Sequence, residues 1–312
     1  MARFVMMNFL VIERMKGRLL SHLIDQYKNI HIQYENLDSF HFIYDKPFIL
    51  SVMWNGVKYE FLIRVRSNSS RMIVLGSGAG GYHENPIGPP IFQRHSWIND
   101  LHDTVIYYND PTLYLGNILL GWGQGTKERY YLKDIATILT KLIEKTKVLH
   151  KNVLFFGSSG GGFMSLMLAG FLKDTVALVN NPQTCLTKWI SGPVQNVFRH
   201  SYSGLSEEEI IEKYRERINV IEFYKSIQYV PEIHYVQNVA CEFDVVNHMI
   251  PFIEGLKNIK DNGIINHVYF DLYHKIVGDT MLANHVALGK EETIHYLNHL
   301  HEFRFNKNKE VE

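Results

Sequence analysis

One short stretch of the sequence has the residue types and spacing of a serine nucleophile. In Gly157-Ser158-Ser159-Gly160-Gly161, glycines stand two positions before and two positions after Ser159, as in the G-x-S-x-G turn that presents a serine hydroxyl. Glycine leaves room where a Cβ atom would collide with the neighbouring strand or helix. The N–H of Gly160 would face the oxyanion formed when the hydroxyl attacks a carbonyl. The alternative is a Gly/Ser loop that only caps a helix or binds phosphate.

The residues on either side of this stretch predict the elements that such a turn needs. Residues 153–156 are all apolar and predict a buried strand, whereas residues 163–170 predict a helix. A strand, a tight turn and a helix in this order favour the nucleophile over the phosphate loop.

A second glycine-rich stretch raises the alternative of a dinucleotide site. Gly76, Gly78 and Gly81 satisfy G-x-G-x-x-G, a pattern that needs a following helix to bind the pyrophosphate. Residues 82–90 contain three prolines and cannot form that helix. We therefore expect a loop that supplies the second oxyanion N–H, with Ser77, Gly78 and Ala79 as candidates, of which we favour Gly78 and Ala79.

A serine hydroxyl needs a base, and in this arrangement an acid and then a histidine follow the serine along the chain. We favour His285 over His274, because His285 lies on a loop long enough to return to Ser159. Histidines also occur at 295, 299 and 301, but no third metal ligand accompanies them, so no metal is expected.

The acid is expected after the penultimate strand, because it must hold the tautomer of the base. Asp244 is our choice there and Glu242 is the near alternative. Asp271 lies inside a predicted strand and is a poorer candidate. A solvated loop carboxylate without a catalytic role also fits.

Three further side chains are candidates for substrate binding. Asn181 and Gln183 follow the strand predicted over 175–179, at the ligand side of a parallel sheet. Arg94 belongs to a loop that would line the pocket mouth. The alternatives are turn residues for the first two and an ordinary surface loop for Arg94.

Composition limits the class of protein. The 312 residues are 46% hydrophobic, and 32 Lys and Arg balance 32 Asp and Glu, so nothing points to nucleic acid or an anionic membrane.

Two cysteines are too few for a disulfide framework and suit a reducing compartment. Residues 1–12 are apolar but too short to span a membrane and lack a small-residue cleavage site. We expect a cytoplasmic protein; the oligomeric state is not predicted.

One domain is expected over residues 1–312. Its first part, 1–70, would hold a helix at 13–29 and a β-hairpin whose Asn55-Gly56 predicts a type I′ turn. A helical insertion is expected at about 184–228, which would form a lid that excludes water from the site or, equally, part of the scaffold. Its capping box predicts a helix from Glu207 to Arg217.

The chain resembles the α/β-hydrolase superfamily and, within it, the bacterial capsular polysaccharide O-acetyltransferases. The likeness covers roughly residues 71–303 and is carried by Gly157–Gly162, Asn180–Gln183, Asn284-His285 and the final helix with Ile294-His295-Tyr296. The fold this implies is a mostly parallel central sheet with antiparallel N-terminal strands and a helical insertion.

The resemblance also implies an acyl intermediate on Ser159, a base at His285, acetyl-CoA as donor and a polysaccharide hydroxyl as acceptor. In one departure, Cys241 stands where the family's aspartate tends to fall. Asp244 or Glu242 would then serve from a shifted position, or a Ser–His pair would remain. A carbohydrate or carboxyl esterase, a non-catalytic glycan-binding or assembly protein, and a nucleotide-binding oxidoreductase are the alternatives.

Overall fold

The computed structural model describes residues 26–79, 89–259 and 265–307 of the chain. One nine-stranded sheet has the order β1-β2-β3-β5-β4-β6-β7-β8-β9. The strands are β1 (Lys28–Gln33), β2 (Phe48–Trp54), β3 (Val57–Arg64), β4 (Met72–Leu75), β5 (Thr104–Tyr108), β6 (Val153–Ser159), β7 (Val176–Pro182), β8 (Glu232–Asn238) and β9 (Val268–Tyr273). The helices are α2 (Tyr131–Thr146), α3 (Gly160–Phe171), α4 (Ser191–Ser201), α5 (Glu207–Ile218), α6 (Val220–Ile227), α7 (Glu242–Asp244), the π-helical turn Val245–Met249, α8 (Ile250–Lys257) and α9 (Lys290–Lys307).

The sheet is mostly parallel. Only β3 runs antiparallel to its neighbours β2 and β5, whereas β4 to β9 are parallel throughout. The carboxyl ends of parallel strands meet at one edge of a sheet. The carboxyl ends of β6, β7, β8 and β9 therefore lie at the same edge. Ser159 ends β6 there, and the other predicted site residues, Gln183, Asp244 and His285, follow β7, β8 and β9.

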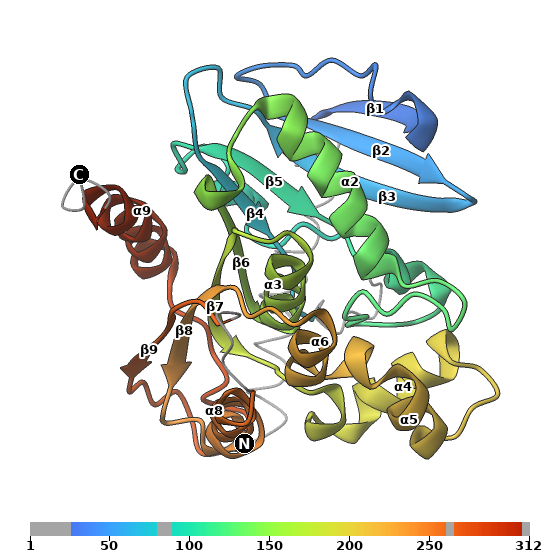
Figure 1. Cartoon of the computed structure of the whole chain (residues 1–312), viewed down its shortest axis with the longest axis vertical. Coiled ribbons are helices and arrows are strands. Elements are labelled where there is room, and N and C mark those ends of the chain that lie inside the picture. Colours follow the sequence, from blue (N-terminus) through green and yellow to red (C-terminus); the bar gives the residue numbers. More distant parts are fainter. Residues whose placement is uncertain (1–25, 80–88, 260–264, 308–312) are drawn as a thin grey trace, which may run out of the picture.

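Both faces of the sheet are covered. Phe155 of β6 packs in one core cluster with Phe163 of α3, while Phe156 packs in a second cluster with Leu297 of α9. Figure 1 shows α2 and α3 crossing in front of the strands. This two-sided burial explains why β6 is apolar at successive positions rather than at alternate ones.

The predicted fold class is confirmed, a mostly parallel sheet with antiparallel N-terminal strands. The predicted hairpin is also present, with positive φ at Asn55 (47°) and Gly56 (78°). The helix expected at 13–29 falls mostly outside the described residues, and its end is wrong, because Lys28 already begins β1. Half-buried Ile30 and Ile32 alternate there with exposed residues, the period of an edge strand.

The predicted insertion contains α4, α5 and α6. The capping box is confirmed, because Ser206 Oγ accepts from Glu209 N and Glu209 Oε2 accepts from Ser206 N. Helix α6 packs tightly against α3, because a Cβ added to Gly170 of α3 would collide with Phe223 of α6. Such close packing makes α6 part of the core rather than a movable lid. In the described part of the chain no helix is both long and apolar enough to cross a membrane.

Candidate active site

The turn after β6 holds Ser159 in a strained conformation. Its φ and ψ are 55° and −126°, in a region that non-glycine residues rarely adopt. The adjacent glycines are needed because a Cβ on Gly157 would overlap the backbone of Gly161, and one on Gly161 would lie 2.8 Å from the carbonyl oxygen of Gly76. The close crossing of β6, α3 and the loop after β4 therefore requires the glycine pattern and leaves Ser159 at the apex.

Gln183 holds the hydroxyl of Ser159. Its Nε2 donates to Ser159 Oγ at 3.1 Å, and Trp122 Nε1 donates to its Oε1, so the indole fixes which end of the amide faces the serine. Gln183 is fully buried. The sequence suggested that Gln183 binds substrate, whereas the structure places its amide against the candidate nucleophile. No sequence signal pointed to Trp122.

His285 and Asp244 form a hydrogen-bonded pair. His285 Nδ1 lies 2.7 Å from Asp244 Oδ2, and the carboxylate side chain is fully buried. A carboxylate beside Nδ1 accepts its proton and leaves the lone pair on Nε2, the atom that a general base uses. His274 is exposed. The catalytic roles stay predictions, but the two side chains chosen from the sequence are in contact.

Ser159 and His285 line one cavity of about 220 Å³. Its wall consists of Gly78, Ala79, Gln93, Ser158, Ser159, Asn180, Asn181, His285 and Ala287. The loop after β4, the ends of β6 and β7, and the loop after β9 thus meet at the carboxyl edge of the sheet. The serine hydroxyl accepts a hydrogen bond from Gln183, and a serine–histidine hydrogen bond in such sites often forms only in the substrate complex.

The candidate oxyanion donors come from two segments: Gly78 and Ala79 line this cavity, and Gly160 directly follows Ser159. Gly160 begins α3, where N–H groups have no carbonyl partner within the helix. Gly78 N donates to Gln93 Oε1 at 2.8 Å, and Gln93 Nε2 donates to Ala79 O at 2.8 Å. Gln93, which the sequence did not single out, thus shapes this loop. Gly78 would have to leave Gln93 to act, so Ala79 is the better second candidate.

Asn180 and Asn181 hold the loop that carries His285. Asn181 Nδ2 donates to Val286 O at 2.8 Å, and Asn180 Oδ1 accepts from Leu288 N at 2.7 Å. Asn181 Oδ1 also accepts from Asn238 N at 2.8 Å, which ties the loop to the end of β8. Asn181 lines the cavity as expected, but its amide is engaged in positioning the histidine loop.

The surroundings of Asp244 contain two buried titratable groups that stay uncharged at neutral pH. Burial raises the pKa of the Cys241 thiol to about 11, and burial lowers the pKa of His248 to about 4. His248 Nδ1 accepts from Thr184 N at 3.3 Å. Among the titratable groups around Asp244, His285 is the one placed to share a proton with its carboxylate, at 2.7 Å.

Cys241, Asp244 and His285 also offer three ligand atoms within 4.8 Å of one another. A thiol binds metal as the thiolate, and burial of Cys241 opposes loss of its proton. The short contact between Asp244 and His285 is accounted for by a hydrogen bond. The geometry thus favours an acid–base pair over a metal centre.

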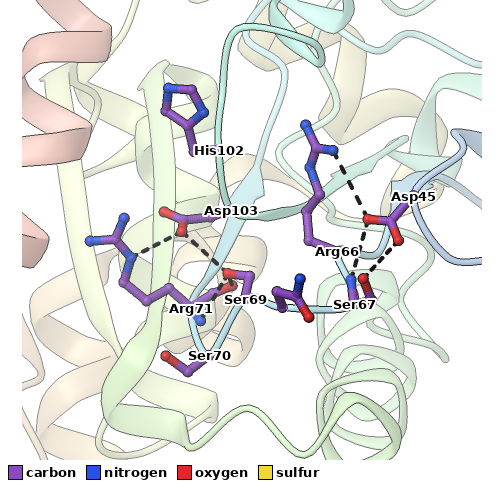
Figure 2. A pocket seen from close by; sticks show the side chains of 9 residues that line it. Asp45, Arg66, Ser67, Ser69, Ser70, Arg71, His102 and Asp103 are labelled. Carbon is purple, nitrogen blue, oxygen red and sulfur yellow. Dashed lines mark hydrogen bonds and ion pairs between the residues drawn. The ribbon is translucent and has the colours of Figure 1, made fainter.

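A second hollow, of about 490 Å³, lies at the amino ends of β4 and β5, opposite the cavity (Figure 2). Its two arginines face aspartates: Arg71 Nε is 2.9 Å from Asp103, and Arg66 Nη1 is 4.0 Å from Asp45. These pairs neutralise its charges, and we assign it no function.

No protein-family model and no curated protein matches the sequence. Among solved structures, the chain is similar to the capsule O-acetyltransferase of Neisseria meningitidis serogroup A in complex with CoA, with a TM-score of 0.55 and 17% identity over 78% of this chain and 94% of that one. It is also similar to Porphyromonas gingivalis dipeptidyl peptidase 4, with a TM-score of 0.55 and 12% identity over 85% of this chain and 36% of that one. Pyrococcus horikoshii acylaminoacyl peptidase gives 0.50 and 13%, over 74% and 37%.

These likenesses show the α/β-hydrolase fold, and the predicted resemblance to capsule O-acetyltransferases is confirmed at the level of structure.

Proposed function

We propose that the protein is a serine acyltransferase that moves an acetyl group from acetyl-CoA to a hydroxyl of a bacterial surface polysaccharide, through an acyl-Ser159 intermediate. The observation that carries this proposal is the shared cavity, which is lined both by Ser159 on its strained turn and by His285, the hydrogen-bond partner of Asp244. The structural likeness to a capsule O-acetyltransferase solved with CoA supports the choice of donor and acceptor.

In the first half-reaction, Ser159 Oγ attacks the thioester carbonyl while His285 Nε2 takes the hydroxyl proton. Asp244 stabilises the resulting imidazolium. The N–H groups of Gly160 and Ala79 would bind the oxyanion. Collapse of the tetrahedral intermediate breaks the carbon–sulfur bond, and His285 returns its proton to the leaving thiolate of CoA.

In the second half-reaction, the acceptor hydroxyl attacks the acyl carbonyl, and His285 takes the proton of that hydroxyl. Ser159 leaves as an alkoxide and recovers the proton from His285, so the enzyme is regenerated. A cavity of about 220 Å³ suits a short acyl group. Water in place of the sugar hydroxyl gives an esterase with the same residues.

The esterase is the second candidate, because the same fold occurs in the acylaminoacyl peptidase. Cys241 at the family's acid position favours a non-catalytic scaffold, but the carboxylate of Asp244 lies beside His285 and supplies the group that Cys241 lacks.

The test is incubation with acetyl-CoA, with and without capsular oligosaccharides, followed by intact mass. We expect one acetyl group on the protein or the glycan, and Ser159→Ala should lower its rate at least about 10³-fold. The exposed Ser191→Ala is the control and should behave as wild type. Cleavage of p-nitrophenyl acetate with intact acetyl-CoA would identify the esterase. No labelling of Ser159 by a fluorophosphonate would contradict both enzymes.

A further inference from the structure

Arg94 is a half-buried cation that packs behind the cavity wall. It precedes a short helical turn with φ at 64°. Its Nη2 donates to Ser158 Oγ at 2.7 Å, and the guanidinium lies 5.4 Å and 5.2 Å from the ring centres of Trp97 and Phe156. Arg94 makes no ion pair with a carboxylate in the described part of the chain. It differs in this from Arg66 and Arg71, which face aspartates in Figure 2.

An arginine in such a position is costly to the fold. Removing a cation from water without a counter-ion costs free energy that aromatic rings only partly offset. Burial lowers the pKa of Arg94 to about 10, so the side chain still carries its charge at neutral pH. Arg94 is separated from the cavity only by the hydroxyl of Ser158, so a role in the cavity would account for a charge that is costly to bury.

Ser158 transmits this charge to the cavity. It lines the cavity beside Ser159, and its oxygen accepts the proton of Arg94. Because a hydroxyl both accepts and donates, the O–H of Ser158 remains available as a donor. An anion at that wall would meet a donor hydroxyl with a full positive charge directly behind it.

We propose that Ser158 and Arg94 form an anion subsite for the acceptor, which holds a carboxylate or phosphate of an acidic glycan next to the hydroxyl that is acetylated. This rests on the proposed function. The anion is assigned to the acceptor, because the pantetheine arm separates the phosphates of CoA from a thioester placed at Ser159.

The subsite can be tested by binding alone, in the Ser159→Ala background. The probe is a glucuronate-containing oligosaccharide, compared by calorimetry with its carboxyl-reduced form, which differs only in charge. A sugar phosphate and its free sugar form the second pair and separate phosphate from carboxylate. We expect at least one charged ligand to bind roughly tenfold tighter than its neutral partner, the usual size for a charge-assisted hydrogen bond.

When Arg94→Gln is combined with Ser159→Ala, the preference for the charged ligand should disappear. Arg94→Lys, which keeps the charge, should retain part of it. Arg71→Gln, at the opposite edge of the sheet, is the matched control and should keep the preference in full. Raising the salt concentration should weaken the preference in the presence of Arg94 only.

Equal binding within both pairs, no binding by any ligand, or a preference that survives Arg94→Gln would overturn the subsite. So would a rise in KM for acetyl-CoA when Arg94→Gln is made in the protein that retains Ser159, with an unchanged ratio of acceptor affinities, since the subsite would then serve the donor. A charge preference without any acetyl transfer would sink the proposed function and leave the subsite standing. Acetyl transfer without a preference for the charged ligands would overturn the subsite and leave the proposed function standing.

Discussion

Asp244 reaches His285 from three positions beyond Cys241, the place where the resemblance puts an aspartate. Cys241 precedes α7, and Asp244 ends it. Residues three apart on a helical turn lie on the same face, so one turn of helix returns a side chain to the region that Cys241 occupies. The ligand atoms of both residues accordingly lie within 4.8 Å of His285. A shift of three positions thus preserves the carboxylate.

Asp244→Asn should lower kcat by roughly 10³- to 10⁴-fold, because the amide cannot stabilise the imidazolium or select the Nδ1–H tautomer. The assay is acetyl transfer or, for an esterase, p-nitrophenyl acetate cleavage. Glu242→Gln is the control, since Glu242 is exposed, and Cys241→Ala should cost less than about tenfold. Full activity in Asp244→Asn together with loss in Glu242→Gln would transfer the acid role to Glu242.

At the scale of elements, the junction of β6 with α3 leaves no room for side chains. A Cβ on Gly157 would overlap backbone atoms of Gly161, which cannot move aside as a flexible side chain can. The turn and the positive φ of Ser159 therefore depend on the same close approach.

Gly157→Ala should lower the free energy of unfolding by about 3 kcal/mol or more, because overpacking here forces apart a strand and a helix. It should also abolish fluorophosphonate labelling of Ser159. The measurement is chemical denaturation together with the labelling assay. Gly192→Ala, in α4 with open space around it, should be neutral or slightly stabilising. Similar losses in both variants would contradict this account of the turn.

The loop between β9 and α9 shows how elements far apart in sequence position one residue. Val286 and Leu288, which directly follow His285 in the loop, bond to Asn181 and Asn180 at the end of β7. Asn238 at the end of β8 donates its Nδ2 to Asn284 O at 2.9 Å. The ends of two neighbouring strands thus set the place of the histidine.

At the scale of the whole molecule, buried His248 makes stability depend on pH. The unfolded chain binds a proton at this histidine below a pKa of about 6.5, whereas the native protein resists it down to about 4. The stabilisation is therefore complete above pH 6.5 and is lost as the pH falls toward 4.

Between pH 6.5 and 4 the free energy of unfolding of wild type should fall by up to about 3 kcal/mol because of His248. His248→Gln, which keeps an acceptor for the Thr184 N–H, should not show this part of the fall. The measurement is the free energy of unfolding in urea at several pH values for both proteins. The exposed His274→Gln is the control and should follow wild type. Parallel curves for wild type and His248→Gln would contradict the assignment.

The sequence by itself determined the strand–turn–helix around Ser159, the hairpin and the capping box, because glycine spacing, Asn-Gly and Ser-x-x-Glu act over a few residues. It also ranked His285 and Asp244 first. Only the tertiary structure decided that these two meet, that Asn181 and Gln183 hold His285 and Ser159, and that Arg94 lies behind Ser158. Such contacts join residues that are distant in sequence, and they depend on which strand ends are neighbours in the sheet, which no local pattern encodes.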